Sequence, residues 1–464
     1  MDPSSDKLKR KRVPGPANGP FGIRHIYSCN TRPLEFYERL GAYGDIATFR
    51  MFGVRAFFLN SPELISTVLR DTGPRFRKLP RNMKALARGL GRGVLVTDGD
   101  EWLADRRLVQ PSFNSRAIEK IIADAVPCVE GLVERWSHES QIELFTEMDK
   151  LTVDVAARSL LGMELELEVE QISAAARMLA DSWAVSLRRV FLLPHWLPLP
   201  RQRREAKAIQ FLRNAIDRII RHRRASSVVR SDLLSRLVIA YSHADGDATT
   251  NHERLIDQVL TLFLAAYHAS TVTLCWTFYL LARYADIHAQ VLNEIEAVLG
   301  DRTPTLVDLS ELPLTENVLK ESMRLYPSAW ELFPRQAIET TDLGPWRIPR
   351  GAWIFLSPYV THRDERFFAN PRMFDPGRWA PGRVEAIDPR AYFPFGGGRH
   401  ICVGRDMAMA QNMLILVMIL RIYRMRTQQI EHVPDRLPPM ALVPRDPMWM
   451  AVERYPAPVP ALIS

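Results

Sequence analysis

One cysteine lies in a glycine-rich stretch, FGGGRHICVG, which runs from Phe395 to Gly404. Glycines leave the backbone free to approach a bulky group and to aim its N–H groups at a nearby sulfur. Such donors stabilise a thiolate, and the thiolate is the form of cysteine that ligates a metal. Cys402 is therefore a candidate metal ligand, and Arg399 and His400 are candidate partners for the anionic groups of a cofactor. Taken alone, the stretch is equally consistent with a buried structural cysteine beside a tight turn.

The cysteines indicate neither a disulfide framework nor a zinc site. There are four of them, spread along the chain without a CxxC pair: Cys29, Cys128, Cys275 and Cys402. This spacing favours a reducing compartment. A cysteine-based zinc or redox protein is the weaker alternative, because no second cysteine lies near Cys402 in the sequence.

Two further motifs place charged side chains at helical spacing. In KESMRLYP, Glu321 and Arg324 could form a surface ion pair worth about 0.3–0.5 kcal/mol. In DGDEWLADRRLVQPSF, Trp102 and Arg106 lie one helical turn apart, where such side chains often merely stack. Neither pair identifies a function by itself.

The stretch around Cys402 resembles the cysteine-ligand loop of the cytochrome P450 family. Phe395, Gly398, Cys402 and Gly404 stand at that family's positions, and His400 occupies its Arg/His slot. The resemblance implies that the cofactor is heme b, that Cys402 is the axial thiolate ligand of its iron, and that His400 binds a heme propionate.

Other motifs of the same family follow in the expected order, from about Pro14 to the C-terminus. The resemblance implies further heme contacts, toward the propionates or against the ring: Trp102, Arg106, Arg335, Phe395, Ala265 and Gly404. KESMRLYP resembles the family's ExxR pair, and HRDERFFANPRMFDPGRW resembles its meander segment. Arg378 is expected to contact Glu321 and Arg324 in a structural trio.

The central apolar stretch LFLAAYHAST departs from the family pattern. The family usually carries an acid followed by a threonine there, and this chain has His268 and Ala269 in those slots. An alanine cannot donate the hydrogen bond that organises proton delivery during O2 activation. Ser270 lies about 100° from Ala269 around a helix, and His268 lies about 100° away on the other side. His268 could relay a proton through water or could be a hydrogen-bonded core residue.

Three explanations of this departure remain open. The substrate supplies a hydroxyl or a water network in place of the missing threonine, peroxide is the working oxidant, or the reaction needs only hydrogen abstraction followed by radical coupling or desaturation. A different class is a heme-binding sensor or carrier without catalytic activity. The first explanation is preferred, and electron-dependent product formation distinguishes an enzyme from a sensor.

The resemblance implies an apolar small-molecule substrate, such as a terpenoid or polyketide, that is hydroxylated, epoxidised or oxidatively cyclised. The expected substrate contacts are Leu264, Ala265, Trp330, Leu332 and Phe333. The segments expected to surround the substrate are the 76–95 loop, 187–201, 328–333 and 445–449. Leu262, Ala265, Ala266, Ala269 and Thr273 fall on one stripe of the central helix, which either admits close packing or leaves room for a flat ligand.

The chain has no flavin or iron–sulfur segment, so the expected electron source is NAD(P)H through a separate ferredoxin and ferredoxin reductase or a flavodoxin. Basic residues near the cysteine loop could attract such an acidic partner: Arg106, Arg107, Arg399 and Arg405. The chain has a net charge of +8, but no basic face with interleaved aromatic residues is evident in its sequence. The charge alone therefore does not favour a nucleic-acid partner.

The elements that position these residues are predicted to form a mainly α fold with small β-sheets. A period of 3.6 residues predicts helices at about 115–136, 142–161, 168–190, 203–224, 252–284, 287–300, 314–325 and 405–422. Short β-branched or aromatic runs predict strands at 45–51, 56–59, 346–349 and 352–356 and near the C-terminus. We expect a flexible basic tail over 1–13 and one helical domain of the cytochrome P450 fold with a minor β-rich region over 14–464.

Residues 258–282 carry no formal charge and are long enough to cross a membrane. The polar residues among them favour a buried central helix instead, because lipid would leave those groups unpaired. The N-terminus lacks the apolar core of a signal peptide or anchor, so a cytoplasmic monomer is expected.

Overall fold

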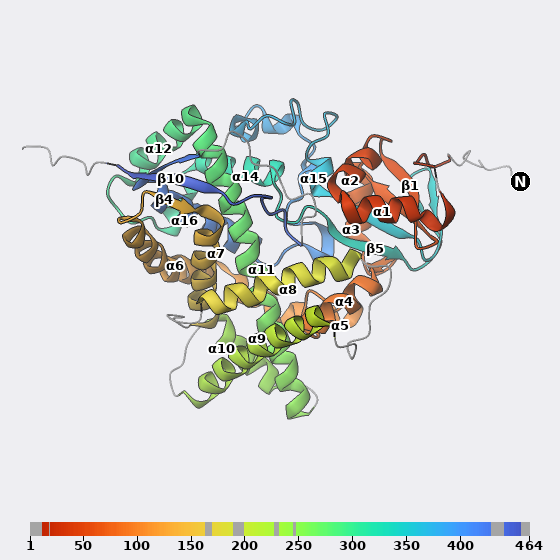
Figure 1. Ribbon diagram of the computed structural model, residues 1–464, viewed down its shortest axis with the longest axis horizontal. Helices are drawn as coiled ribbons and strands as arrows, with labels where there is room; N and C mark the ends of the chain where they lie inside the picture. The colour runs from red at the N-terminus through yellow and green to blue at the C-terminus, as the bar shows by residue number, and fades with distance from the viewer. Residues whose placement is uncertain are drawn as a thin grey trace, which may run out of the picture.

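The computed structural model describes residues 12–17, 19–162, 169–188, 199–226, 232–244, 247–427 and 440–455. Long helices form most of this part of the chain, and small sheets lie at its edges (Figure 1). Helix α11, Ala248–Arg283, runs through the centre, and the sheet that contains β1 and β5 lies to one side with α1, α2 and α3 beside it. The predicted mainly α fold class is confirmed. Most of the predicted basic tail lies outside the described residues.

The helices of the N-terminal half are α1 Ile23–Thr31, α2 Pro33–Gly41, α3 Pro62–Arg70, α4 Pro80–Leu90, α5 Gly99–Val109, α6 Ser115–Trp136, α7 Leu144–Ala156, α8 Val169–Arg188, α9 Pro200–Ala225 and α10 Leu233–Ser242. The later helices are α11, α12 Ala285–Leu299, α13 Leu306–Ser310, α14 Pro313–Leu325, α15 Pro358–Thr361 and α16 Arg405–Leu420. Each predicted helix therefore exists, although a short strand takes the first residues predicted for α7.

The larger sheet has the order β1-β2-β8-β5-β3, with only β2 and β8 parallel. Its strands are β1 Ile46–Met51, β2 Val54–Leu59, β8 Trp353–Leu356, β5 Leu332–Ala337 and β3 Phe76–Lys78. A second sheet has the order β4-β10-β9, and β6 pairs with β7. These strands are β4 Gln141–Glu143, β10 Trp449–Arg454, β9 Tyr423–Thr427, β6 Thr341–Leu343 and β7 Trp346–Ile348.

Helix α11 is a core helix. Among the described residues it is the one helix long and apolar enough to cross a membrane, and 72% of its most apolar window is buried inside the protein. Its polar side chains find partners there: the hydroxyls of Thr271 and Thr152 are 2.7 Å apart, and Trp276 Nε1 donates to Leu442 O at 2.7 Å. This pairing supports the prediction of a buried central helix.

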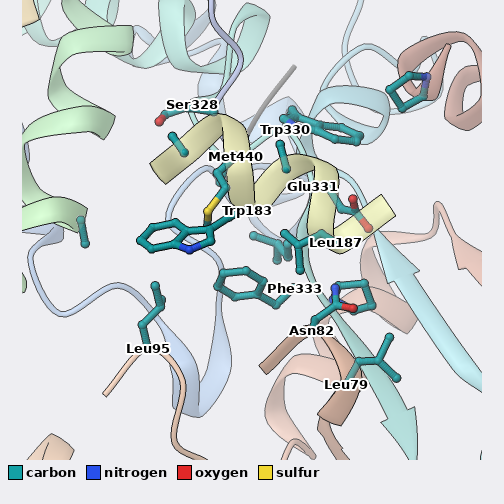
Figure 2. A pocket seen from close by; sticks show the side chains of 18 of the residues that line it. Leu79, Asn82, Leu95, Trp183, Leu187, Ser328, Trp330, Glu331, Phe333 and Met440 are labelled. Carbon is teal, nitrogen blue, oxygen red and sulfur yellow. The ribbon is translucent and has the colours of Figure 1, made fainter. Parts of the chain in front are cut away.

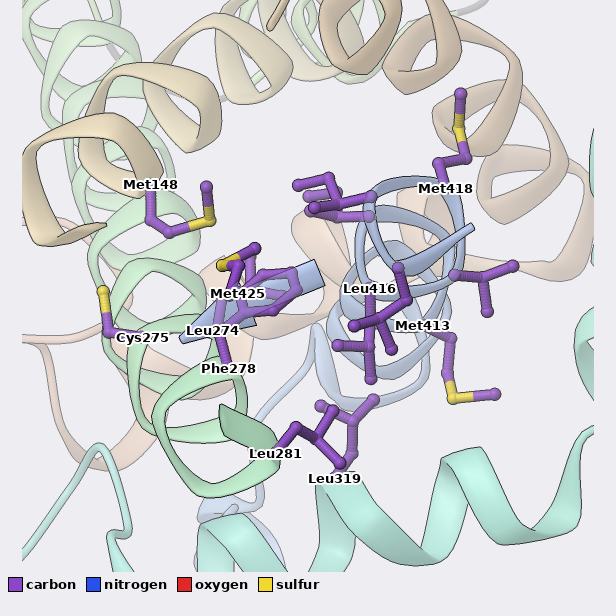
Figure 3. Packing of buried hydrophobic residues seen from close by; sticks show 14 of the residues in the cluster. Met148, Leu274, Cys275, Phe278, Leu281, Leu319, Met413, Leu416, Met418 and Met425 are labelled. Atoms are coloured by element: carbon purple, nitrogen blue, oxygen red, sulfur yellow. The ribbon is translucent and has the colours of Figure 1, made fainter. Parts of the chain in front are cut away.

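The C-terminal half of α11 packs into the largest apolar cluster (Figure 3). Leu274 and Phe278 of α11 lie near Met425 of β9, and Leu281 lies near Leu319 of α14. Burying each of these side chains contributes about 1.5–3 kcal/mol. The cluster therefore anchors the C-terminal half of α11 in the core, while residues in the middle of the helix, between 261 and 269, line a cavity.

The region expected as the 76–95 loop is a strand followed by a helix. Pro80 occupies the first position of α4, where its fixed φ suits a helix and no N–H is needed. Strand β5 was not predicted either, because it contains Pro334, which cannot donate to a ladder. The pairing of β5 with β8 shifts register between Leu332 and Arg335, and Pro334 lies at that irregularity.

Candidate active site

The loop before α16 holds Cys402 in a conformation that requires glycine. Gly396 and Gly398 have φ values of 71° and 63°, in the left-handed region. A Cβ on Gly398 would lie 2.1 Å from the carbonyl oxygen of Leu69 in α3, so only glycine fits there. The N–H of Cys402 donates to Phe395 O at 3.0 Å and closes the loop.

Cys402 lies three residues before α16, Arg405–Leu420, and is accessible to solvent. Cys402 is exposed, whereas Cys29, Cys128 and Cys275 are buried. Surrounding protein raises the pKa of the thiol, while a hydrogen bond from the Gly404 N–H and the positive charge of Arg106 lower it. In the part of the chain that the structure describes, no cluster of His, Cys, Asp and Glu could hold a metal.

The indole of Trp102 and the imidazole of His400 pack together, with ring centroids 4.1 Å apart. Both ring nitrogens of His400 are buried without a hydrogen-bond partner, and Asp98 Oδ1 is 3.7 Å from Nε2, too far to accept. Burial and four nearby cations lower the pKa of His400 to about 3. In order of decreasing effect, those cations belong to Lys78, Arg335, Arg399 and Arg106.

These cations have too few anions to balance them. Arg335 is 5% exposed, and its guanidinium donates to Phe333 O and to Thr72 Oγ1. Lys78 of β3 stands directly opposite Arg335 of β5 in the sheet, an arrangement of like charges that is destabilising by itself. Burial lowers the pKa of Arg335 to about 10 and that of Lys78 to about 7. The cluster fits a cofactor that carries carboxylates.

Lys78 was missed by the sequence reasoning. Its ammonium donates to the carbonyls of Val94, Leu95 and Thr97 at 3.3, 2.9 and 2.8 Å, so it ties β3 to the chain between α4 and α5. A lysine at the end of a three-residue strand carries no sequence signal for this role. Its position opposite Arg335 exists only once β3 and β5 pair.

Glu321 and Arg324 are fully buried and form a bidentate ion pair, with both N···O distances 2.8 Å. Arg378 Nε donates to Glu321 Oε1 at 3.3 Å. Arg324 also donates to the carbonyls of His362 and Pro371, each at 2.7 Å. The structure thus brings the predicted trio together, and a buried pair with this many hydrogen bonds fixes the segment that leads to the cysteine loop.

One face of α11 opens onto a cavity. Ala265 and Ala269 are exposed although α11 is otherwise mostly buried, and both line the cavity together with Leu264 and His268. Ser270 is 2% exposed and is not among the lining residues. Three residues of the predicted small-residue stripe, Leu262, Ala266 and Thr273, do not line the cavity either. The part of the stripe that faces the cavity is therefore Ala265 and Ala269.

His268 is enclosed rather than hydrogen-bonded. Both of its ring nitrogens are buried and have no partner among the described residues. Burial, with a smaller contribution from Arg177, lowers its pKa to about 4. The imidazole is therefore neutral at pH 7. The hydroxyl of Thr273 donates to the Ala269 carbonyl at 3.0 Å, so it is already engaged within the helix.

The cavity has a volume of about 330 Å³ and a mostly apolar wall (Figure 2). Its lining includes every predicted substrate contact: Leu264, Ala265, Trp330, Leu332 and Phe333. Leu332 also comes within 4.0 Å of the Cβ position of Gly396, which joins the cavity wall to the cysteine loop. The cavity wall therefore contacts the loop that carries Cys402, although Cys402 itself is not among the lining residues.

Some of the lining was missed by the sequence reasoning or placed in other segments. Trp183 of α8 and Met440 line the cavity and were not predicted. The C-terminal contribution comes from Met440 and Ala441 rather than from 445–449. Of the predicted 187–201 segment, Leu187 lines the cavity, and 189–198 lie outside the described residues. The aromatic residue at 183 could have been suspected from its apolar helix, but not its direction.

Comparisons with known proteins agree with this geometry. Residues 14–450 match the family model described as Cytochrome P450. The chain is 34% identical to cyclooctatin synthase of Streptomyces melanosporofaciens over 87% of each chain. It is 31% identical to cyclooctat-9-en-7-ol 5-monooxygenase of the same organism, over 91% of this chain and 92% of the relative. Pentalenene oxygenase of Streptomyces avermitilis is 29% identical over 88% and 90% of the two chains.

The family match covers nearly the whole chain, two of these relatives exceed 30% identity, and monooxygenase or oxygenase stands in two of the names. The protein is therefore an oxidoreductase of the monooxygenase type that uses heme and electrons from a redox partner. The chain belongs to the cytochrome P450 family.

Proposed function

We propose that this monooxygenase binds heme b through Cys402 and oxidises an alicyclic terpenoid of low polarity. The observation that carries the proposal is the cavity of about 330 Å³ between α11 and the wall from Trp330 to Phe333. Aromatic and aliphatic side chains dominate that wall, and such a surface gains free energy by removing an apolar ligand from water.

The names of the relatives support this substrate class. Pentalenene is named as an alkene, and cyclooctat-9-en-7-ol is named as an alkene that carries one hydroxyl. Both are ring compounds with at most one polar atom. A substrate of that kind suits the cavity better than a charged or strongly polar ligand.

The protein's own groups have distinct tasks in this reaction. When bound, heme supplies the activation of O2. Cys402 would hold the iron, and the cations of Arg106, Arg335 and Lys78 would balance the heme carboxylates. The reaction consumes O2, two electrons and two protons; one oxygen atom enters a C–H or C=C bond of the substrate and the other leaves as water.

Proton delivery must follow an unusual route. Ala269 has no hydroxyl, Ser270 does not line the cavity, and His268 is neutral with both nitrogens enclosed. We propose that a hydroxyl of the substrate, or water that it holds, supplies the missing hydrogen bonds. Electrons come from NAD(P)H through a ferredoxin or flavodoxin, which the exposed Arg107, Arg399 and Arg405 near the cysteine loop would attract.

The test is turnover of a panel of terpenoid hydrocarbons and alcohols under ¹⁸O2 with a surrogate ferredoxin system. The expected product carries one ¹⁸O atom, and formation depends on reductant. A product that forms only with added hydrogen peroxide would favour the peroxide-using alternative. Dehydrogenated or coupled products without ¹⁸O would favour radical chemistry, and no product from any ligand would favour a sensor.

A further inference from the structure

One carboxamide in the cavity wall has no partner. Asn82, in the first turn of α4, is 8% exposed and lines the cavity. Its backbone N–H donates to Leu79 O, but its side chain makes no hydrogen bond to any described residue. The oxygen and nitrogen of its amide are not sealed off by protein atoms, so the amide is accessible from the cavity. Figure 2 shows it beside Leu79 and Phe333, in an otherwise apolar part of the wall.

Most other polar groups of the wall differ from Asn82; the exception is the Ser328 hydroxyl, which also lines the cavity without a hydrogen bond to a described residue. Trp183 Nε1, Thr261 Oγ1 and both nitrogens of His268 lack partners, but protein atoms enclose them, so a ligand cannot reach them without a rearrangement. Glu331 accepts a hydrogen bond from the Tyr37 hydroxyl at 2.8 Å. Asn82 therefore combines access to the cavity with the absence of a protein partner.

A buried amide without a partner disfavours a purely hydrocarbon ligand. Such a ligand would remove water from the amide and offer nothing in exchange, which weakens binding roughly tenfold to a hundredfold. A carboxamide both donates and accepts, and a hydroxyl is the small group that can satisfy both at once. A ketone could only accept.

We infer that Asn82 recognises a hydroxyl that the substrate already carries, so that the substrate is an alicyclic alcohol rather than the parent hydrocarbon. This inference rests on the proposed function and narrows it. The enzyme then follows a reaction that installs the hydroxyl, either oxygenation of the hydrocarbon or a cyclisation that ends with addition of water. It converts an alcohol, O2, two electrons and two protons into a diol or an epoxy alcohol and one water molecule.

The test is an equilibrium titration of the heme-loaded enzyme, followed by the shift of the heme absorption band on ligand binding. The ligands are a fused-ring terpene hydrocarbon and the alcohol that differs from it by one hydroxyl. The wild type is expected to bind the alcohol at least tenfold more tightly. In Asn82→Leu, which keeps the number and branching of the side-chain heavy atoms, the preference should vanish because the hydrocarbon binds better and the alcohol binds worse.

Ser328→Ala is the matched control, because the Ser328 hydroxyl also lines the cavity and forms no hydrogen bond to a described residue. That variant should keep the preference. Equal affinities in the wild type, or a preference that survives in Asn82→Leu, would overturn the assignment of Asn82. If both ligands bind equally and both are oxidised, the proposed function stands and only this inference fails. If neither ligand binds to correctly loaded enzyme, the proposed substrate class fails and this inference fails with it.

Discussion

Arg335 illustrates how single side chains prepare the site for an anionic cofactor. Its guanidinium is buried, faces Lys78 across the sheet, and has only Asp98 among the acids that raise its pKa. A positive charge in that environment is unfavourable unless an anion joins it. We therefore infer that the heme carboxylates stabilise the charge of Arg335, because the protein's own acidic residues do not balance it.

Arg335→Leu should weaken heme retention. Removal of a buried charge-assisted hydrogen bond usually weakens binding by about 1.5–3 kcal/mol, or roughly tenfold to a hundredfold. The measurement is the rate of heme transfer to an excess of apomyoglobin, which reports heme dissociation without relying on activity. The control is Arg107→Leu, which removes an exposed arginine of α5, and it should transfer heme at the wild-type rate. Equal rates for all three proteins would refute the role of Arg335.

The enclosed His268 should make the free energy of unfolding decrease at acidic pH. Its pKa is about 4 in the folded protein and 6.5 by default, so the unfolded chain binds the proton more readily between these values. Stability therefore falls as pH falls through this window, by about 2 kcal/mol between pH 7 and pH 5. Denaturant unfolding should show that His268→Leu loses this part of the pH dependence, whereas His138→Leu, at an exposed position, retains it. The same slope in all three would contradict the enclosed imidazole.

Sequence patterns predict the site unevenly at this scale. The residues in contiguous motifs, Cys402, Glu321 and Trp102, could be predicted because their neighbours along the chain are part of the signal. Lys78 and Asn82 could not, because their roles depend on partners or cavities that exist only after distant segments meet. The direction of Ser270, away from the cavity, likewise depends on how α11 is rotated in its packing.

At the scale of elements, α11 is divided between two tasks. Its C-terminal half packs into the core, and its middle presents Ala265 and Ala269 to the cavity. The uncharged stretch from 258 to 282 correctly predicted a buried helix. Helix α4 was missed because a proline and three nearby glycines, at 89, 91 and 93, interrupt its periodic pattern. All three glycines are needed for tertiary packing: a Cβ at Gly89 would meet Trp183 at 2.6 Å, one at Gly91 would meet Asp257 at 2.1 Å, and one at Gly93 would meet Thr261 at 2.1 Å.

Ala269→Thr tests what the exposed face of α11 lacks. With a ligand that has no hydroxyl, the wild type should release a large fraction of NADPH electrons as hydrogen peroxide, because Ala269 has no hydroxyl to organise proton delivery and Ser270 does not line the cavity. The threonine should lower that fraction severalfold, since general acid assistance typically contributes a hundredfold or more to a proton transfer. Ala269→Val, of similar size, is the control and should not lower it. Low leakage in the wild type with such ligands would mean that ordered water already completes the relay.

At the scale of the whole molecule, the site lies where separate layers meet. The sheet region supplies Lys78 and Arg335, the helical body supplies α11 and α8, and the loop before α16 supplies Cys402. The mainly α class and the long helices could be predicted from periodicity and from the family resemblance. The pairing of β3 with β5 could not, because strands of three residues carry too little pattern.

Exposed basic residues near the cysteine loop should strengthen the binding of an acidic electron donor. Arg107→Glu, at the exposed face of α5 beside the cysteine loop, should raise the KM for an acidic ferredoxin several-fold and weaken its dependence on ionic strength. Arg203→Glu on α9, which packs against α8, α10 and α11, is the matched control and should behave like the wild type. Stopped-flow reduction at low and high salt provides the measurement. Equal effects of the two variants would indicate that only net charge matters.

The central claim is that Cys402 ligates heme iron, and the spectrum of the reduced carbon-monoxide complex tests it most directly. Thiolate ligation shifts the main absorption band of that complex to long wavelength, and the wild type should show this band. Cys402→Ser should lose it while still binding heme, and Cys128→Ala, at a buried cysteine far from the loop in sequence, should keep it. A long-wavelength band that persists in Cys402→Ser, or that is absent from the heme-loaded wild type, would contradict the account.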